Sequence, residues 1–311
     1  MGEARSDPSR HRVLVGVDGS PGSVATLRYA ASEARRRETG LRLVHVVPDY
    51  AVMSPTLPMV PSELEATGRK ILEAAATQAA SLVGREGVVT SLVRGSRVSS
   101  LVRAAEHAVV VVLGREDITM LERLVTGATT IGVASRSARP TIAVPPDWSE
   151  PPGTRPVVVG LKSTEHARGL LCRGFETAAG RGAPLVVVHA WELPSGYDDL
   201  IADRVGREEW HDRLASQVEP HLGEWRAAYP EVDVELRIVH GQPARVLQHT
   251  AAVAGLLLLV RRLYGLPGGH LGGTGRTLLR GSSCPVEVVP VGVVADLETG
   301  PPVPRGGAPL G

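Results

Sequence analysis

The chain repeats its own pattern once, and this duplication limits the fold more than any single motif does. Four segments align with later segments at an offset of about 145 residues. They are 13–18 with 157–162, 43–47 with 187–191, 94–97 with 240–243, and 140–145 with 285–290. We therefore predict two domains of one fold, at 11–147 and 157–291, joined by a Pro-rich linker at 148–156. Residues 1–10 and the Gly- and Pro-rich tail 292–311 are expected to be disordered.

Each repeat alternates short apolar runs with helical patterns. The runs consist mostly of Val and Leu, as strands do in a parallel sheet that is covered on both faces. The alternation predicts a doubly wound sheet with right-handed crossovers. The expected fold class is α/β, with two tandem five-stranded parallel-sheet domains. The predicted strands are 13–17, 41–47, 88–93, 109–113 and 141–144 in the first repeat, and 157–161, 185–190, 232–239, 256–260 and 286–289 in the second.

Composition and charge narrow the class of protein. Hydrophobic residues make up 43% and charged residues 22% of the 311 residues, and the net charge is +1 without a long basic run. This balance argues against a nucleic-acid or membrane partner. The longest apolar stretch, 251–260, is shorter than the roughly 18 residues of a membrane span. The first residues are polar and do not resemble a secretory leader. We expect a cytoplasmic protein.

Asp18, Gly19 and Ser20 follow the first predicted strand. In open α/β sheets, ligands bind beyond the carboxyl ends of the strands, where the strand order reverses. Ser20 as N-cap and Pro21 at the first helical position predict that a helix begins there, with free N–H groups facing a ligand. The Asp18 carboxylate would accept hydrogen bonds from hydroxyls or from an adenine amino group. Alternatively, Asp18 is only a loop or capping residue.

A glycine also ends the fourth predicted strand. Gly114 is followed by a loop and then by a second glycine, in "TGATT" at 126–130. This pattern is compatible with a phosphate cradle built from backbone N–H groups. No His-x3-His or Cys-x2-Cys pair predicts a metal site. His45 and His189 occupy equivalent positions in the second strands, where hydrogen bonds within the sheet are expected to satisfy their rings.

Three segments together resemble the universal stress protein family. They are "VGVDGS" in the first repeat, and "HGQPA" and "SCPVEVVP" in the second. The resemblance covers 11–291 and implies a five-stranded parallel α/β sandwich, of which some members bind ATP. Those members carry Gly-x2-Gly-x9-Gly-Ser/Thr after strand four, which maps onto Gly114, Asp117, Gly127 and Ala128, with Thr129 and Thr130 next. The family's adenine contact, made by the backbone at the end of strand two, would fall on Val46 or Val47.

The second repeat departs further from that pattern. Lys162 stands in place of Asp18, and Arg261 in place of the strand-four glycine. Two interpretations stay open. Either a cationic pocket binds another anion, or the pocket has lost its ligand. The candidate residues of this pocket are Lys162, Arg261, Arg262, Gly272 and Gly273.

Two functions remain for the whole chain. One is a stress protein that binds ATP, with Mg²⁺, in the first domain and thereby regulates an unknown protein partner. The other is a nucleotide-free interaction protein or scaffold with both pockets degenerate. No catalytic residues can be named, although slow ATP hydrolysis stays open. Because exposed Val-rich edge strands need cover, we expect 141–144 and 286–289 to pair into an internal pseudo-dimer. A homodimer of the chain also stays open.

Overall fold

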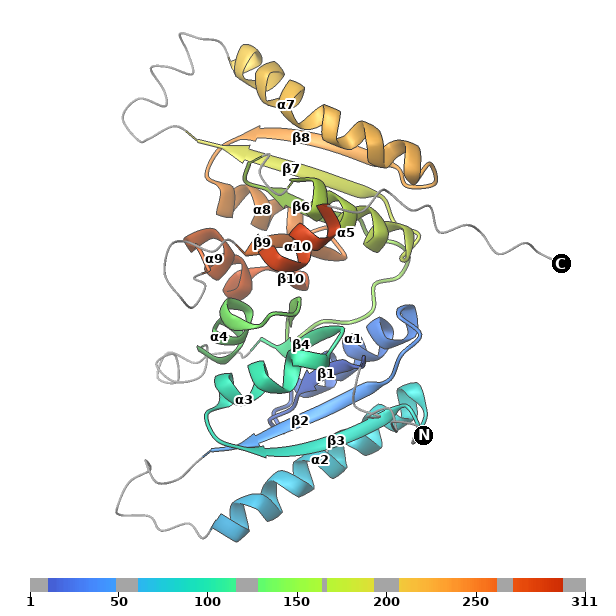
Figure 1. Cartoon of the computed structure of the whole chain (residues 1–311), viewed down its shortest axis with the longest axis vertical. Helices are drawn as coiled ribbons and strands as arrows, with labels where there is room; N and C mark the ends of the chain where they lie inside the picture. The colour runs from blue at the N-terminus through green and yellow to red at the C-terminus, as the bar shows by residue number, and fades with distance from the viewer. Residues whose placement is uncertain are drawn as a thin grey trace, which may run out of the picture. The chain divides into compact units, whose positions relative to one another are not determined.

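The computed structural model describes residues 11–48, 61–115, 128–163, 167–192, 207–261 and 271–298. The chain forms two compact units (Figure 1). The first runs to Glu150 and also takes in the late segment Pro285–Pro290. The second contains Pro151–Arg261 together with two C-terminal helices. Among the residues described, no helix is long and apolar enough to cross a membrane.

The first unit contains an open sheet with the strand order β3-β2-β1-β4-β5. All four pairings among these strands are parallel. β10 (Val286–Pro290) runs antiparallel to β5, with Val286 opposite Ala143 and Val288 opposite Thr141. The other strands are β1 (Val13–Gly16), β2 (Leu41–Val47), β3 (Val88–Arg94), β4 (Val110–Gly114) and β5 (Thr141–Val144).

Helices cover this sheet in pairs (Figure 1). α1 (Ser23–Arg36) packs against α2 (Pro61–Val83), and α3 (Arg97–Ala104) packs against α4 (Ala128–Arg136). A short 3₁₀ turn, η2 (Ala105–His107), follows α3. The core on the α3–α4 side joins side chains of β1, β2 and β4 to both helices, through Leu14, Val44, Val46, Leu101, Val111, Leu113 and Val133. This double cover explains why the strand sequences lack polar alternation.

The second unit has the strand order β9-β6-β7-β8, again with every pairing parallel. Its strands are β6 (Val157–Leu161), β7 (Leu185–Trp191), β8 (Val234–His240) and β9 (Leu256–Arg261). Its helices are α5 (Ala167–Ala179), α7 (Arg207–Ala228), α8 (Pro243–Ala251), α9 (Gly273–Gly281) and α10 (Val291–Glu298). The predicted α/β class, with two tandem units of mostly parallel strands, is therefore confirmed.

The predicted start of the first helix is wrong. α1 begins at Ser23 with Gly22 as its N-cap, and the residues from Asp18 to Gly22 form a turn. The Asp18 carboxylate binds the Ser20 N–H and the Ser23 hydroxyl, and the Ser20 carbonyl accepts the Ser23 N–H. These local bonds compete with the helix for the first residues, as short polar side chains commonly do.

The predicted disorder of the tail begins too early. α10 continues the ordered chain to Glu298, and its Val294 is completely buried. α10 packs on α5, which explains why a segment that precedes a Gly- and Pro-rich tail is helical. Residues 1–10 and 299–311 lie outside the described residues, so the disorder predicted for them stays a prediction.

Candidate functional site

A cavity of about 250 Å³ lies in the first unit, at the carboxyl ends of β1 and β4. The strand order reverses between these two strands, so the cavity occupies the switch point that doubly wound sheets use for ligands. Seven of the predicted site residues line it: Asp18, Ser20, Val46, Val47, Gly114, Thr129 and Thr130. Gly19 lies between two of them. Ala128 begins α4, whereas Asp117 and Gly127 lie outside the described residues.

The Asp18 carboxylate lines the cavity and accepts hydrogen bonds from the turn that follows it. Its Oδ1 accepts a hydrogen bond from the Ser20 backbone N–H at 2.9 Å and one from the Ser23 hydroxyl at 3.1 Å. Both of these bonds are made to Oδ1 and not to Oδ2. Burial raises the pKa of Asp18. The hydrogen bonds from Ser20 and Ser23 lower this pKa by more than burial raises it, so the net pKa lies below its ordinary value. The ionised Oδ2 can therefore accept hydrogen bonds from a ligand.

Val46 is the better placed of the two predicted backbone contacts. The Val44 carbonyl accepts the Val17 N–H on the β1 side, while the Val47 carbonyl accepts the Gly95 N–H on the β3 side. Successive residues of a strand point their backbone polar groups to alternate sides. The N–H and C=O of Val46 therefore point to the β1 side, beyond the last residue of β1, where the cavity opens.

His45 also lines the cavity, on β2 between Val44 and Val46. Its Nδ1 lies 2.7 Å from the Val17 carbonyl oxygen. Because a carbonyl can only accept, Nδ1 must carry the proton, and this bond fixes the strand end that leads into Asp18. His189 binds the Leu161 carbonyl in the same way at 3.2 Å, and burial lowers its pKa. The predicted hydrogen bonding of both rings is confirmed.

Two glycines allow helices to approach the cavity closely. A Cβ on Gly114 would lie 2.8 Å from Thr26 Oγ1 of α1, and the Gly114 carbonyl accepts the Thr130 hydroxyl of α4 at 3.1 Å. A Cβ on Gly68 of α2 would lie 2.9 Å from His45 Cδ2. At the end of β4, Gly114 thus packs closely against α1 and accepts a hydrogen bond from α4, in addition to its predicted place in a phosphate cradle.

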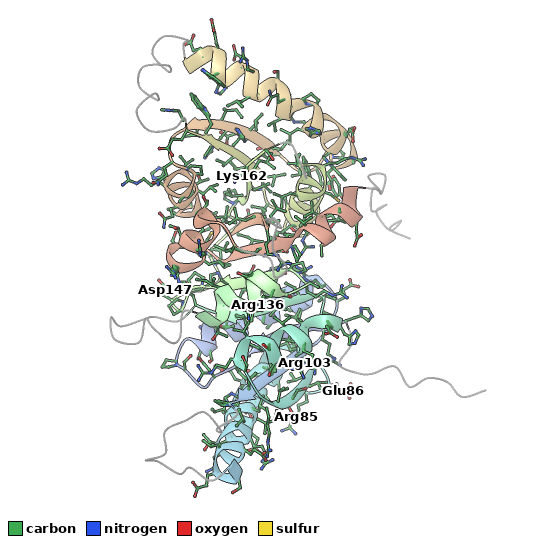
Figure 2. The ribbon with its side chains drawn as sticks, turned by 60° about the vertical axis from the view of Figure 1, so that its left-hand side comes forward. Arg85, Glu86, Arg103, Arg136, Asp147 and Lys162 are labelled. Atoms are coloured by element: carbon green, nitrogen blue, oxygen red, sulfur yellow. The ribbon has the colours of Figure 1, made fainter. Side chains whose placement is uncertain are left out.

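The corresponding place in the second unit differs in charge and in side-chain size. Lys162, labelled in Figure 2, follows β6 and is exposed. Arg261 ends the adjacent strand β9 and is buried, and this burial lowers its pKa. Gly272 and Gly273 stand at the start of α9, and Arg262 lies outside the described residues. A second, cationic pocket made by these residues stays a prediction.

An aromatic ring of the second repeat occupies a position that lines the cavity in the first. Trp191 aligns with Val47, which lines the first-unit cavity. The rings of Trp191 and Trp210 stack with centroids 5.8 Å apart, and His240 lies 4.4 Å from Trp191. The Arg213 guanidinium lies 5.4 Å over Trp210. In the second unit, the place equivalent to Val47 therefore holds a cluster of the protein's own aromatic rings.

Comparison with known proteins identifies the family. The family model for the universal stress protein family matches residues 9–145 and 153–290. The chain belongs to the universal stress protein family. Two relatives from Mycobacterium tuberculosis are similar over both repeats. Universal stress protein Rv2005c is 30% identical over 294 residues, with 90% of this chain and 97% of the relative covered. Universal stress protein Rv1996 is 31% identical over 318 residues, with 94% and 97% covered.

Solved structures support the fold of this universal stress protein. The crystal structure of a universal stress protein from Archaeoglobus fulgidus has a TM-score of 0.62 at 16% identity, with 91% of this chain and 97% of that chain covered. The crystal structure of PA1789 from Pseudomonas aeruginosa has a TM-score of 0.60 at 14% identity, with 94% and 96% covered. At such identities the likeness concerns the fold alone.

Several cavity residues of this universal stress protein were not predicted from its sequence. They are Leu64, Thr67 and Gly68 of α2, and Arg97 and Leu101 of α3. The α2 residues could not be recognised from sequence, because a helical pattern does not reveal which turn lies over a strand end. Arg97 could have been recognised, since it stands where Pro243 stands in the alignment of 94–97 with 240–243.

Proposed function

We propose that the first unit binds an adenine nucleotide, with ATP as the expected ligand, and that the bound state regulates contact with a protein partner. The cavity at the β1–β4 switch point carries this proposal, because it collects the carboxylate of Asp18, the backbone of Val46 and the start of α4 around one space. Its volume of about 250 Å³ lies just below the roughly 300–1,000 Å³ that small-molecule pockets occupy.

Each part of the cavity suits one part of a nucleotide. The Val46 N–H and C=O can pair with the adenine edge, and the Asp18 Oδ2 can accept hydrogen bonds from the ribose hydroxyls. The first turn of α4 offers N–H groups and a positive dipole to phosphate. Among the described residues no three metal-binding side chains gather, so Mg²⁺ would be held chiefly by the nucleotide phosphates.

Calorimetry on the full chain tests this function. We expect ATP to bind the wild type, and Asp18→Asn to weaken binding at least tenfold, since hydrogen bonds to charged groups contribute about 1.5–3 kcal/mol. Asparagine can still accept the Ser20 N–H, so the turn is retained. Lys162→Ala changes the equivalent position of the second repeat and should leave the affinity unchanged. Titrations with and without Mg²⁺, together with measured phosphate release, separate binding from slow hydrolysis.

Undetectable binding of millimolar ATP would overturn the proposal. The chain would then be the nucleotide-free interaction protein that its altered loop sequence also allows. Mass spectrometry of nucleotides extracted from the purified chain gives an independent check, because a bound nucleotide should accompany the wild type in a larger amount than Asp18→Asn.

A further inference from the structure

Arg97 is a cation at the cavity that the family pattern does not explain. It is the first residue of α3, its side chain is exposed, and it lines the cavity. Within the described ranges, no hydrogen bond or ion pair joins it to another residue. The equivalent residue of the second repeat is Pro243, at the start of α8. The first unit thus has a cation at the cavity where the second has an uncharged helix-initiating residue.

This replacement works against the stability of α3. The N-terminus of a helix carries a partial positive charge, so a basic residue there is unfavourable, whereas proline is preorganised for the first helical position. The first turn of α3 contains no acidic residue that would offset Arg97. A cation retained at this position without an acidic neighbour is consistent with an anion that comes from outside the chain.

The start of α3 lies beside α4. A Cβ added to Gly132 of α4 would lie 2.8 Å from the side chain of Val98, the residue after Arg97. Thr129 and Thr130, on the first turn of α4, line the same cavity as Arg97. Arg97 is therefore on the side of the cavity where the helix start favours phosphate, whereas Asp18 lies at the end of β1.

We propose that Arg97 contacts a phosphate of the bound nucleotide and makes the first unit prefer phosphorylated adenosine over adenosine itself. This inference rests on the proposed function. An arginine–phosphate pair is charge-assisted and can be bidentate. It would compensate for the hydroxyl that Ala128 lacks at the Ser/Thr position of the family's phosphate motif. The site would then recognise the phosphate with a side chain from α3 as well as with the first turn of α4.

The second repeat supplies a variant that is expected to fold. Arg97→Pro installs the residue that starts α8. The preceding Ser96 has φ −66° and ψ 128°, close to the φ −57° and ψ 119° of Gln242 before Pro243. This extended conformation is the one that a residue before proline prefers. Arg103→Ala is the matched control, because Arg103, labelled in Figure 2, belongs to the last turn of the same helix and does not line the cavity.

The experiment compares AMP with adenosine, which differ only in the phosphate, by calorimetry on the full chain. We expect the wild type to bind AMP about tenfold more tightly than adenosine. Arg97→Pro should weaken AMP binding about tenfold and leave adenosine binding within twofold. Arg97→Lys should retain part of the preference for AMP, and Arg103→Ala all of it.

Each other outcome has a distinct meaning. An unchanged AMP affinity in Arg97→Pro would overturn the role of Arg97 and leave the proposed function intact. An equal loss for AMP and adenosine would also overturn it, because Arg97 would then act on the shape of the site and not on the phosphate. If the wild type binds neither compound and no ATP, the proposed function itself fails, and the role of Arg97 fails with it.

Discussion

Gly19 is the residue that most restricts the turn below the cavity. Its φ is +81°, in the left-handed region, and an added Cβ would lie 3.1 Å from Cγ1 of Ile71 on α2. Two separate constraints therefore require glycine at this position. Gly84, after α2, has nearly the same φ of +80° but no atom within 4 Å of an added Cβ. Gly84 therefore shares the first constraint with Gly19 and lacks the second.

Alanine substitutions can separate these constraints. Gly84→Ala should lower the free energy of unfolding by about 1 kcal/mol, because of the left-handed backbone alone. Gly19→Ala should lower it further, since Ile71 must also move. Urea unfolding of both variants measures the difference. Equal losses would mean that Ile71 adjusts freely, and the Asp18 turn would then depend only on backbone conformation.

Some cavity residues could be predicted from sequence because they follow strands. Asp18, Val46 and Gly114 stand at strand ends, and the carboxyl ends of parallel strands meet at one edge of a sheet. For His45, only the hydrogen bonding of its ring was predicted. Its place at the cavity depends on how far β1 extends beside it, which the sequence does not show. The contribution of α2 could not be predicted, because the close approach of Gly68 to β2 depends on tertiary packing.

At the scale of elements, strands were predicted better than helix ends. Every strand of both units lies within about two residues of its predicted bounds, since a buried parallel strand appears in sequence as an uninterrupted apolar run. The start of α1 was placed two residues early, because Asp18 binds groups that a helix would otherwise use. α10 was missed because its eight residues were averaged with the Gly- and Pro-rich tail that follows.

The packing of α10 on α5 depends on Gly169. A Cβ there would lie 2.1 Å from the Val294 carbonyl oxygen, which is backbone and cannot rotate away. We expect Gly169→Ala to lower the free energy of unfolding by about 1–3 kcal/mol, as overpacking usually does, and to reduce amide-exchange protection in 291–298. The measurements are thermal unfolding and hydrogen exchange followed by mass spectrometry.

Gly223→Ala, in α7, is the matched control for Gly169→Ala. Gly223 lies in α7, is exposed, and has no atom within 4 Å of an added Cβ. The substitution should raise stability by up to about 1 kcal/mol, because alanine is a better helix former than glycine. Unchanged protection of 291–298 in Gly169→Ala would mean that α10 adapts its position, and the close contact with Gly169 would not be what holds it.

At the scale of the whole molecule, duplication allows the two copies to diverge. The first unit has Asp18 and a cavity at its switch point, whereas the second has Lys162 in place of Asp18 and Trp191, stacked on Trp210, in place of Val47. The hydrogen bond from the strand-two histidine to the end of strand one is retained in both. The fold therefore does not depend on whether Asp18 or Lys162 follows the first strand. This is why the fold could be predicted for both repeats, but a ligand for only one.

The first unit is closed by a strand from the far end of the chain. β5 is almost completely buried, and its Thr141 and Ala143 lie opposite Val288 and Val286 of β10. A fragment of residues 1–150 lacks β10 and would expose β5 as an apolar edge, which promotes pairing with another copy. We expect this fragment to self-associate, as measured by sedimentation and by light scattering after size exclusion. A soluble, monomeric fragment would contradict the predicted pseudo-dimer.

A proline substitution makes this test specific to the edge. The carbonyls of Pro140 and Val144 accept N–H groups from the β4 side, at Val111 and Arg115. Because backbone groups alternate along a strand, the N–H of Ala143 points to the β10 side. Ala143→Pro in the fragment therefore removes an edge donor without touching the β4 ladder, as edge strands tolerate. The substituted fragment should be monomeric, and if it associates as strongly as its parent, the association does not proceed through β5.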